Sequence, residues 1–245
     1  MFLFIYALAE SLLMFLYLLL ANIVVLYINH FVSSKTTELS LIQNREPLTD
    51  IVHHHIGEVD EYYLNITLFA QLVIFLFYFF KHCQHKLIMY LKVNCFVLLM
   101  FSLRVLTIIS TQYPNARSCD NSYQYCGDMM FSGHSVIVLT QYLSMSTYLT
   151  IENSENKEYK SSKHKNTKHK SNTKRIDVIL TKEPISNTHL RFYKILNRLH
   201  LILTITNLFL IIAVRLHYTN DVLISSYLSV ITWKYIDIYS KLQKV

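Results

Sequence analysis

The chain is poor in residues that interrupt helices, with three glycines and three prolines among 245 residues. It has no glycine-rich loop ending in Lys-Ser or Lys-Thr, the pattern that cradles nucleotide phosphates. It also has no cluster of carboxylates suited to a divalent ion. These absences argue against ATP and against a bound metal. The apolar runs lack the strict alternation of outer-membrane strands, so helices are expected.

Hydrophobic residues make up 52% of the chain, and the mean hydropathy is +0.28. They form runs close to the roughly 20 residues that a helix needs to cross a bilayer. The sequence therefore predicts an all-α, polytopic membrane protein with a six-transmembrane helix bundle. The expected spans are residues 2–29, 64–80, 87–110, 131–151, 199–214 and 222–239.

Two of these spans need comment. The first resembles a secretory signal, but no basic residue precedes it and it is longer than a usual signal core, so we interpret it as a retained anchor. Residues 1–30 are then a first transmembrane helix, and residues 31–245 a catalytic membrane domain. The sixth span gives the weakest signal because Lys234 and Asp237 fall inside it.

Basic residues predict the orientation, because cytosolic loops are enriched in Lys and Arg. Three lie between residues 81 and 92, twelve between 157 and 198, and three from Lys234 onward. The connections on the other side carry only Lys35, Arg45 and Arg117. Both termini are therefore expected in the cytosol. The fourth span then begins, and the fifth ends, on the lumenal or exterior side.

Two short motifs lie at those positions. Cys126–His134 precedes the fourth span, and His217–Asp221 follows the fifth. Ionisable groups at membrane segments are costly and usually functional. Because both motifs are expected at one membrane depth, His134, His217 and Asp221 can share a site, although some eighty residues separate them.

The spacing within each motif suits phosphoryl chemistry. Asp221 is four residues after His217, so its carboxylate can accept the Nδ1 proton and leave Nε2 as a nucleophile. His134 opens a helix whose first amides favour a phosphate, and Gly133 permits close approach. The alternative is that each histidine is only a polar residue at the membrane interface.

These residues resemble the signature blocks of the sphingomyelin synthase family, which is related to the lipid phosphate phosphatases of the PAP2 superfamily. The resemblance covers roughly residues 45–240. The Cys-Gly-Asp-x3-Ser-Gly-His and His-Tyr-Thr-x-Asp blocks are supported by an arginine-threonine-threonine-proline block and by a block similar to Pro-Leu-Pro-Asp. The last two correspond to Arg104, Thr107, Thr111 and Pro114, and to Glu46–Asp50.

The resemblance implies a ceramide phosphotransferase with His134, His217 and Asp221 as catalytic residues and no cofactor. His217 would attack the phosphorus of phosphatidylcholine or phosphatidylethanolamine, and His134 would exchange protons with diacylglycerol and ceramide. The expected partners are these lipids, the bilayer and, in a homo-oligomer, a second copy of the chain; no nucleic acid is expected. The implied substrate-binding residues are Arg104, Asp128, Ser132, Gly133, Leu216 and Tyr218.

Departures from the family pattern leave alternatives open. Leu216 stands where these synthases usually have an acidic residue, so the choice between choline and ethanolamine remains open. A lipid phosphatase, with water as acceptor, shares the two histidine motifs. It is disfavoured because Leu210 and Ile211 stand where the phosphatases have Ser-Arg. A non-catalytic membrane scaffold or transporter would not need both motifs.

Other features are less specific. Cys119 and Cys126 share an outer loop and can form a disulfide. The run His53–His55 is expected in a solvated outer loop rather than at a metal. Residues 152–190 are predicted as a basic, low-complexity cytosolic insertion, either contacting anionic lipids or unconstrained. The expected location is the Golgi, another endomembrane or the plasma membrane, with the site facing the lumen or exterior.

Overall fold

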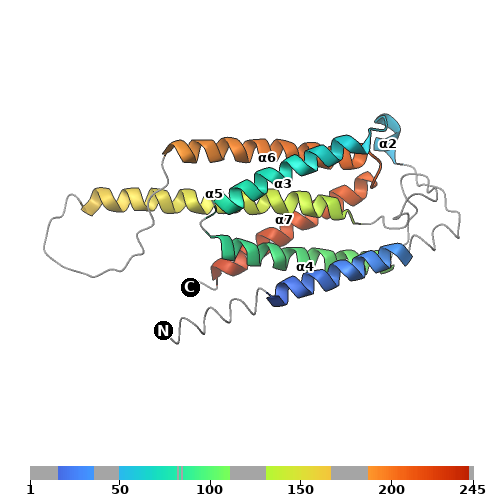
Figure 1. Ribbon diagram of the computed structural model, residues 1–245, viewed down its shortest axis with the longest axis horizontal. Helices are drawn as coiled ribbons and strands as arrows, with labels where there is room; N and C mark the ends of the chain where they lie inside the picture. The colour runs from blue at the N-terminus through green and yellow to red at the C-terminus, as the bar shows by residue number, and fades with distance from the viewer. Residues whose placement is uncertain are drawn as a thin grey trace.

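The computed structural model describes residues 16–35, 50–81, 83, 85–110, 131–166 and 187–242. Within these ranges every regular element is a helix (Figure 1). The elements are an N-terminal helix Leu16–Lys35, α2 Ile51–His55, α3 Glu61–Lys81, α4 Lys86–Ser110, α5 Gly133–Asn166, α6 Asn187–Ala213 and α7 Thr219–Leu242.

The six long helices form one elongated bundle with α5 at its centre, where it contacts α3, α4, α6 and α7. The N-terminal helix lies along α4 (Figure 1). At one end of the bundle α3, α5 and α7 begin and α4 and α6 end; we call it the His134 end. The other, which we call the Glu152 end, holds the short connection between α3 and α4.

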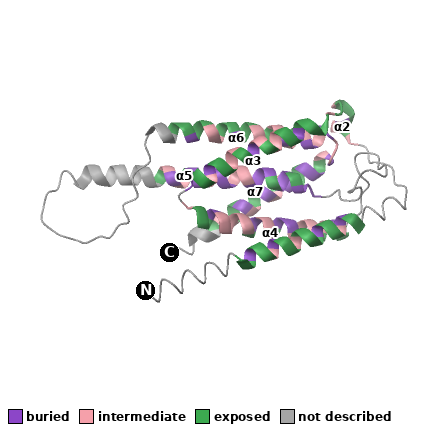
Figure 2. Cartoon of the chain, viewed as in Figure 1, coloured by how far each residue is buried: buried purple, intermediate pink, exposed green. Residues whose placement is uncertain are grey.

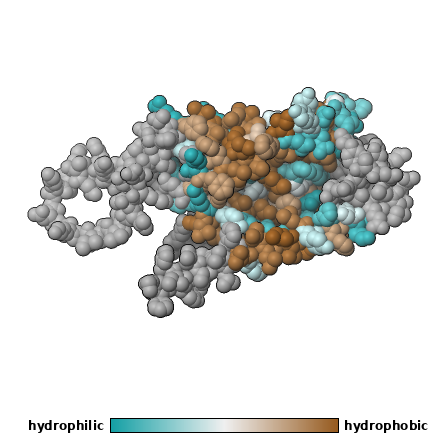
Figure 3. Space-filling view, viewed as in Figure 1, coloured by the Kyte–Doolittle hydropathy of each residue, from teal (hydrophilic) through white to brown (hydrophobic). Residues whose placement is uncertain are grey.

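The prediction of a helical membrane protein is confirmed. Four helices are long and apolar enough to cross a bilayer: Leu16–Lys35, Glu61–Lys81, Lys86–Ser110 and Arg191–Ala213. Many of their apolar residues are exposed, and the exposed positions are green in Figure 2. The visible face carries a hydrophobic band across its middle (Figure 3). Such a surface suits lipid rather than water.

Helices α5 and α7 are not apolar enough to be counted among these spans, because they contain more polar residues. Several of those polar residues are buried inside the bundle. Ser135, Thr140 and Ser144 on α5 are buried, as are Ser225 and Ser229 on α7. Thr140 and Ser144 donate their hydroxyl groups to carbonyls one turn earlier. By length and apolar character, the described helices thus support four of the six predicted spans.

Side-chain caps explain where several helices begin. Asp50 caps α2 by accepting the N–H of Val52 at 2.9 Å, and Asp60 accepts that of Tyr62 at 2.8 Å before α3. Ser132 accepts the N–H of Ser135 at 3.2 Å at the start of α5. Each oxygen satisfies an amide that lacks an acceptor within its own helix.

The charges that weaken two of the predicted spans are paired with each other. Lys92 on α4 donates to Asp237 on α7 at 3.0 Å, and both side chains are mostly buried. The Lys92 ammonium also lies 5.7 Å from the ring centroid of Tyr148. Two charges that are costly separately can thus be accommodated together.

The helices depart from the predicted boundaries at two places. Helix α5 continues to Asn166 and α6 begins at Asn187, so helical structure extends into the segment expected to be low-complexity. The N-terminal helix is described from Leu16. Helix α6 ends at Ala213, and Arg215 in the turn that follows has a φ of 59°. This left-handed conformation usually takes glycine, and here it turns the chain toward α7.

Candidate active site

The two motif histidines lie side by side at the His134 end. His134 is in the first turn of α5, and His217 is in the short turn between α6 and α7. Their ring centroids are 5.9 Å apart with an interplanar angle of 62°. His134 is exposed, whereas His217 is 5% exposed. The bundle thus brings two distant motifs together, with one accessible and one enclosed imidazole.

Asp221 faces His217 from the first turn of α7. Its Oδ2 lies 4.0 Å from Nδ1 of His217, beyond hydrogen-bond distance, and this buried Nδ1 has no hydrogen-bond partner among the described residues. The same oxygen accepts the backbone N–H of Tyr218 at 3.1 Å. Asp221 therefore serves as an N-terminal cap of α7 and is one small side-chain rotation from His217. Catalytic contacts are often this loose before substrate binds.

Arg104 brings a positive charge to the start of α5. Its Nε donates to the carbonyl of Phe131 at 3.1 Å, and its Nη1 donates to Oδ1 of Asn29 at 3.2 Å. A Cβ at Gly133 would lie 3.5 Å from this Nε. The guanidinium therefore lies within van der Waals reach of the first residue of α5. Together with the first amides of α5, it makes a site suited to an anion.

The electrostatic setting keeps His217 neutral. Burial lowers the pKa of its imidazole well below the usual value, and the neighbouring His134 and Arg104 lower it further. A neutral imidazole retains the lone pair that a nucleophile needs. With Nδ1 turned toward Asp221, Nε2 is the nitrogen left for that role.

Asp50 is a further residue of this region, and sequence reasoning gave it no role of its own. Its Oδ2 accepts the N–H of Thr219 at 2.7 Å, and its Oδ1 accepts the Thr219 hydroxyl at 3.1 Å. Burial raises the pKa of Asp50, but the N–H groups of Thr219 and Val52 outweigh this and hold the pKa below its usual value. One carboxylate thus caps both α2 and α7, next to His217.

The histidine run is not the solvated loop that the sequence suggested. It forms α2, and His53 is buried, with its ring 6.0 Å from that of Tyr218 in a stacked arrangement. Nη2 of Arg215 donates to the His53 carbonyl at 3.4 Å. The expectation was wrong for His53 because α2 folds back onto the turn that holds His217. No local pattern in the sequence reveals that contact.

The remaining predicted residues have varied surroundings. Ser132 is buried and engaged as the cap of α5, and Tyr218 is buried against His53. Leu216 packs on an apolar cluster of α3, α6 and α7 that includes Leu64 and Val222. Asp128, the Cys119–Cys126 pair, Thr111, Pro114 and residues 46–49 lie outside the described residues.

Comparison with known proteins points to one superfamily. The family described as PAP2 superfamily C-terminal matches residues 177–238, a segment that includes both His217 and Asp221. No curated protein matches the chain. The match supports a relation to the PAP2 superfamily and lipid chemistry of the phosphatase or phosphotransferase type.

Proposed function

We propose that the protein is a membrane phosphotransferase that moves a phospho-head group from a glycerophospholipid to the primary hydroxyl of ceramide. The observation that carries this proposal is the contact between His134 and His217, with Asp221 and Arg104 beside them. Two imidazoles, one accessible and one enclosed and neutral, are what a two-step transfer through a phosphohistidine requires. The match over residues 177–238 supports the same chemistry.

In the first step, Nε2 of His217 attacks phosphorus and a P–N bond forms. The bond from phosphorus to the diacylglycerol oxygen breaks, and protonated His134 donates its proton to that leaving oxygen. Arg104 balances the charge that develops on the phosphoryl oxygens. Asp221 stabilises the positive charge that His217 gains.

In the second step the roles reverse. Neutral His134 takes the proton of the ceramide hydroxyl while the hydroxyl oxygen attacks phosphorus. The P–N bond breaks and its electron pair returns to His217. One phosphoester replaces another, so His134 ends protonated and ready for the next donor. With a lipid phosphate monoester as donor and water as acceptor, the same two steps would make the site a lipid phosphatase.

The proposal includes a topology of six spans, with both termini cytosolic and the site lumenal or exterior. Eighteen residues separate His134 from the buried Glu152 on α5, which is about 27 Å along a helix. That length is close to the apolar thickness of a bilayer. Protease protection in sealed vesicles tests it. Cleavage of the Lys157–Arg198 connection from the cytosolic face is expected, and shielding of that connection would overturn the orientation.

The activity test uses purified protein in vesicles that contain phosphatidylcholine with a labelled head group and a fluorescent ceramide. We expect a fluorescent sphingophospholipid that carries the label, formed one-for-one with diacylglycerol. Parallel vesicles with phosphatidylethanolamine measure the head-group choice that Leu216 leaves open. The matched control is His217→Ala.

Each alternative has its own outcome in this assay. Release of water-soluble phosphate from phosphatidate added to the same vesicles, with ceramide unchanged, identifies a phosphatase. If the wild-type protein forms neither product although its helical content is intact, the proposal is wrong. A scaffold or transporter would then be the remaining interpretation.

A further inference from the structure

Two buried asparagines attach the N-terminal helix to α4. Asn22 donates from Nδ2 to the carbonyl and side chain of Asn94, and Asn29 donates from Nδ2 to the carbonyl of Phe101 at 3.0 Å. Each also donates to the carbonyl four residues earlier in its own helix. Both donors and both acceptors are seven residues apart. The two helices therefore run parallel, joined at equivalent points two turns apart.

The two asparagines differ in their other side-chain atom. Oδ1 of Asn22 is buried and has no hydrogen-bond partner in the part of the chain that the structure describes, whereas Oδ1 of Asn29 accepts a hydrogen bond from Nη1 of Arg104 at 3.2 Å. Asn29 is 2% exposed and Asn22 is 7% exposed, so their burial is similar. Both asparagines thus join the N-terminal helix to α4 in nearly the same way. Only Asn29 is also hydrogen-bonded to Arg104.

The link through Asn29 completes the support of the Arg104 side chain. Nε of Arg104 is directed to the Phe131 carbonyl, and Nη1 to Asn29. These two bonds fix the guanidinium plane between α4 and the start of α5, against Gly133. An arginine with five donors in a rigid fork binds phosphate well only when its plane is oriented.

We propose that Asn29 is a positioning residue that holds Arg104 in the orientation that binds the phosphoryl group. This inference rests on the proposed function, because it gives Arg104 the phosphoryl oxygens as its ligand. It also gives the N-terminal helix, which lies at the edge of the bundle, a part in the site. Without Asn29 the guanidinium loses the bond at Nη1 that orients its plane and can rotate away from Gly133.

Loss of this orientation has an electrostatic consequence at the nucleophile. The charged and titratable groups that act on His217 are His134 on α5, Arg104 on α4 and Asp221 on α7. If Arg104 moves away, one positive charge that opposes protonation of His217 is removed. The pKa of His217 then rises toward its ordinary value.

The experiment compares Asn29→Leu with Asn22→Leu in the full-length protein, with Arg104→Gln as reference. The first measurement is thermal stabilisation by orthovanadate, a phosphate mimic, which does not depend on transferase activity. We expect Asn29→Leu and Arg104→Gln each to weaken vanadate binding about tenfold, the size expected when a bond to a charged group is lost. Asn22→Leu should retain wild-type vanadate binding.

The second measurement is the pH dependence of kcat/KM. The acid limb should move to higher pH in Asn29→Leu, while Asn22→Leu should keep the wild-type profile even if both variants lose similar thermal stability. Equal vanadate affinities in the two leucine variants, or no stabilisation of the wild type by vanadate, would overturn the inference. If the vanadate pattern holds but no sphingophospholipid is formed, the ceramide assignment fails and the positioning role stands.

Discussion

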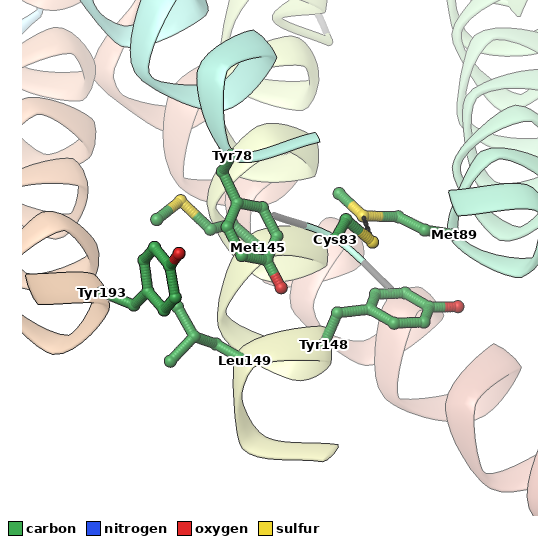
Figure 4. Close-up of a cluster of buried hydrophobic side chains, with 7 residues drawn as sticks. All are labelled: Tyr78, Cys83, Met89, Met145, Tyr148, Leu149 and Tyr193. Carbon is green, nitrogen blue, oxygen red and sulfur yellow. Dashed lines mark hydrogen bonds between the residues drawn. The ribbon is translucent and has the colours of Figure 1, made fainter. Parts of the chain in front are cut away.

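The two ends of the bundle bury similar kinds of side chain but differ in how the ionisable groups among them are paired. At the Glu152 end, the Tyr78 hydroxyl donates to Glu152, and Lys92 is paired with Asp237. Figure 4 shows the aromatic, methionine and cysteine side chains gathered there, with Cys83 against Met89. Charged groups at this end are matched by other groups of the protein.

At the His134 end, several buried polar atoms have no partner within the described part of the chain. They include Nδ1 of His217, the Ser135 hydroxyl and Nε2 of His53. A buried polar group without a partner costs stability, so such atoms are usually retained for a reason. The Tyr148 hydroxyl at the Glu152 end also lacks a partner within the described residues, so the two ends differ in their ionisable groups: Lys92 and Asp237 are hydrogen-bonded, whereas His217 and Asp221 stand 4.0 Å apart.

The largest effect expected at the His134 end follows removal of either histidine. His134→Ala and His217→Ala should each lower the transfer rate at least about a thousandfold, because each takes part directly in the proton or phosphoryl step. The double variant should be scarcely worse than His217→Ala, since the two act as one unit. Steady-state assays in vesicles measure this.

The matched variant at the Glu152 end is Tyr78→Phe, which removes a buried hydroxyl and keeps the ring. It should retain nearly full activity. A loss of activity in Tyr78→Phe as large as in the histidine variants would contradict the assignment of the site to the His134 end.

Two substitutions at Asp221 distinguish its role as a helix cap from its role beside His217. Asp221→Asn keeps an oxygen for the Tyr218 N–H but removes the charge facing His217, so activity should fall about a hundredfold with little change in stability. Asp221→Ala should show the same loss of activity and a further loss of about 1 kcal/mol of stability, because the cap is gone. Full activity in Asp221→Asn would assign the residue to capping alone.

The pair at the Glu152 end should affect stability and not chemistry. Lys92→Met and Asp237→Leu should each destabilise the protein by about 3 kcal/mol, because each leaves a mostly buried charge without its partner. The double variant should recover most of this loss. Thermal unfolding in detergent measures the effect, and additive losses in the double variant would show that the two charges do not interact.

The pH dependence sharpens the description of His217. Its depressed pKa means that the imidazole is neutral at pH 7 and gains a proton only as the pH falls through that lowered value. Activity should therefore fall about tenfold per pH unit on an acid limb whose midpoint lies below about 6.5, the ordinary histidine value. A midpoint above that value in the kcat/KM profile would contradict an enclosed, neutral His217.

The smallest effect is expected at the end of α6. Arg215→Gly relieves a left-handed backbone conformation that costs a non-glycine residue about 1 kcal/mol, and it removes only a 3.4 Å contact to His53. The thermal midpoint should rise slightly or stay unchanged. A clear fall in the midpoint would show that the Arg215 side chain stabilises the turn more than its geometry suggests.

Much of the fold was predictable from local patterns. Long apolar runs with few glycines and prolines require helices in a bilayer, because every backbone group must be satisfied within its own segment. All three prolines lie outside the described helices, and of the glycines only Gly133 lies within one, as its first residue. The positions of His134 and His217 at the ends of such runs likewise depend on sequence order alone. That both motifs share one end follows from the number of intervening helices.

Local sequence patterns are enough to predict the helical membrane class and the candidate residues at helix ends. They do not reveal that Asn29 contacts Arg104, that Asp50 caps α7 or that Lys92 pairs with Asp237, which depend on the packing of the helices. The reason is physical. Periodicity and hydropathy report on contacts within one helix or with lipid, whereas these pairs join residues far apart in sequence. Their partners are set by which helices become neighbours and in which rotation.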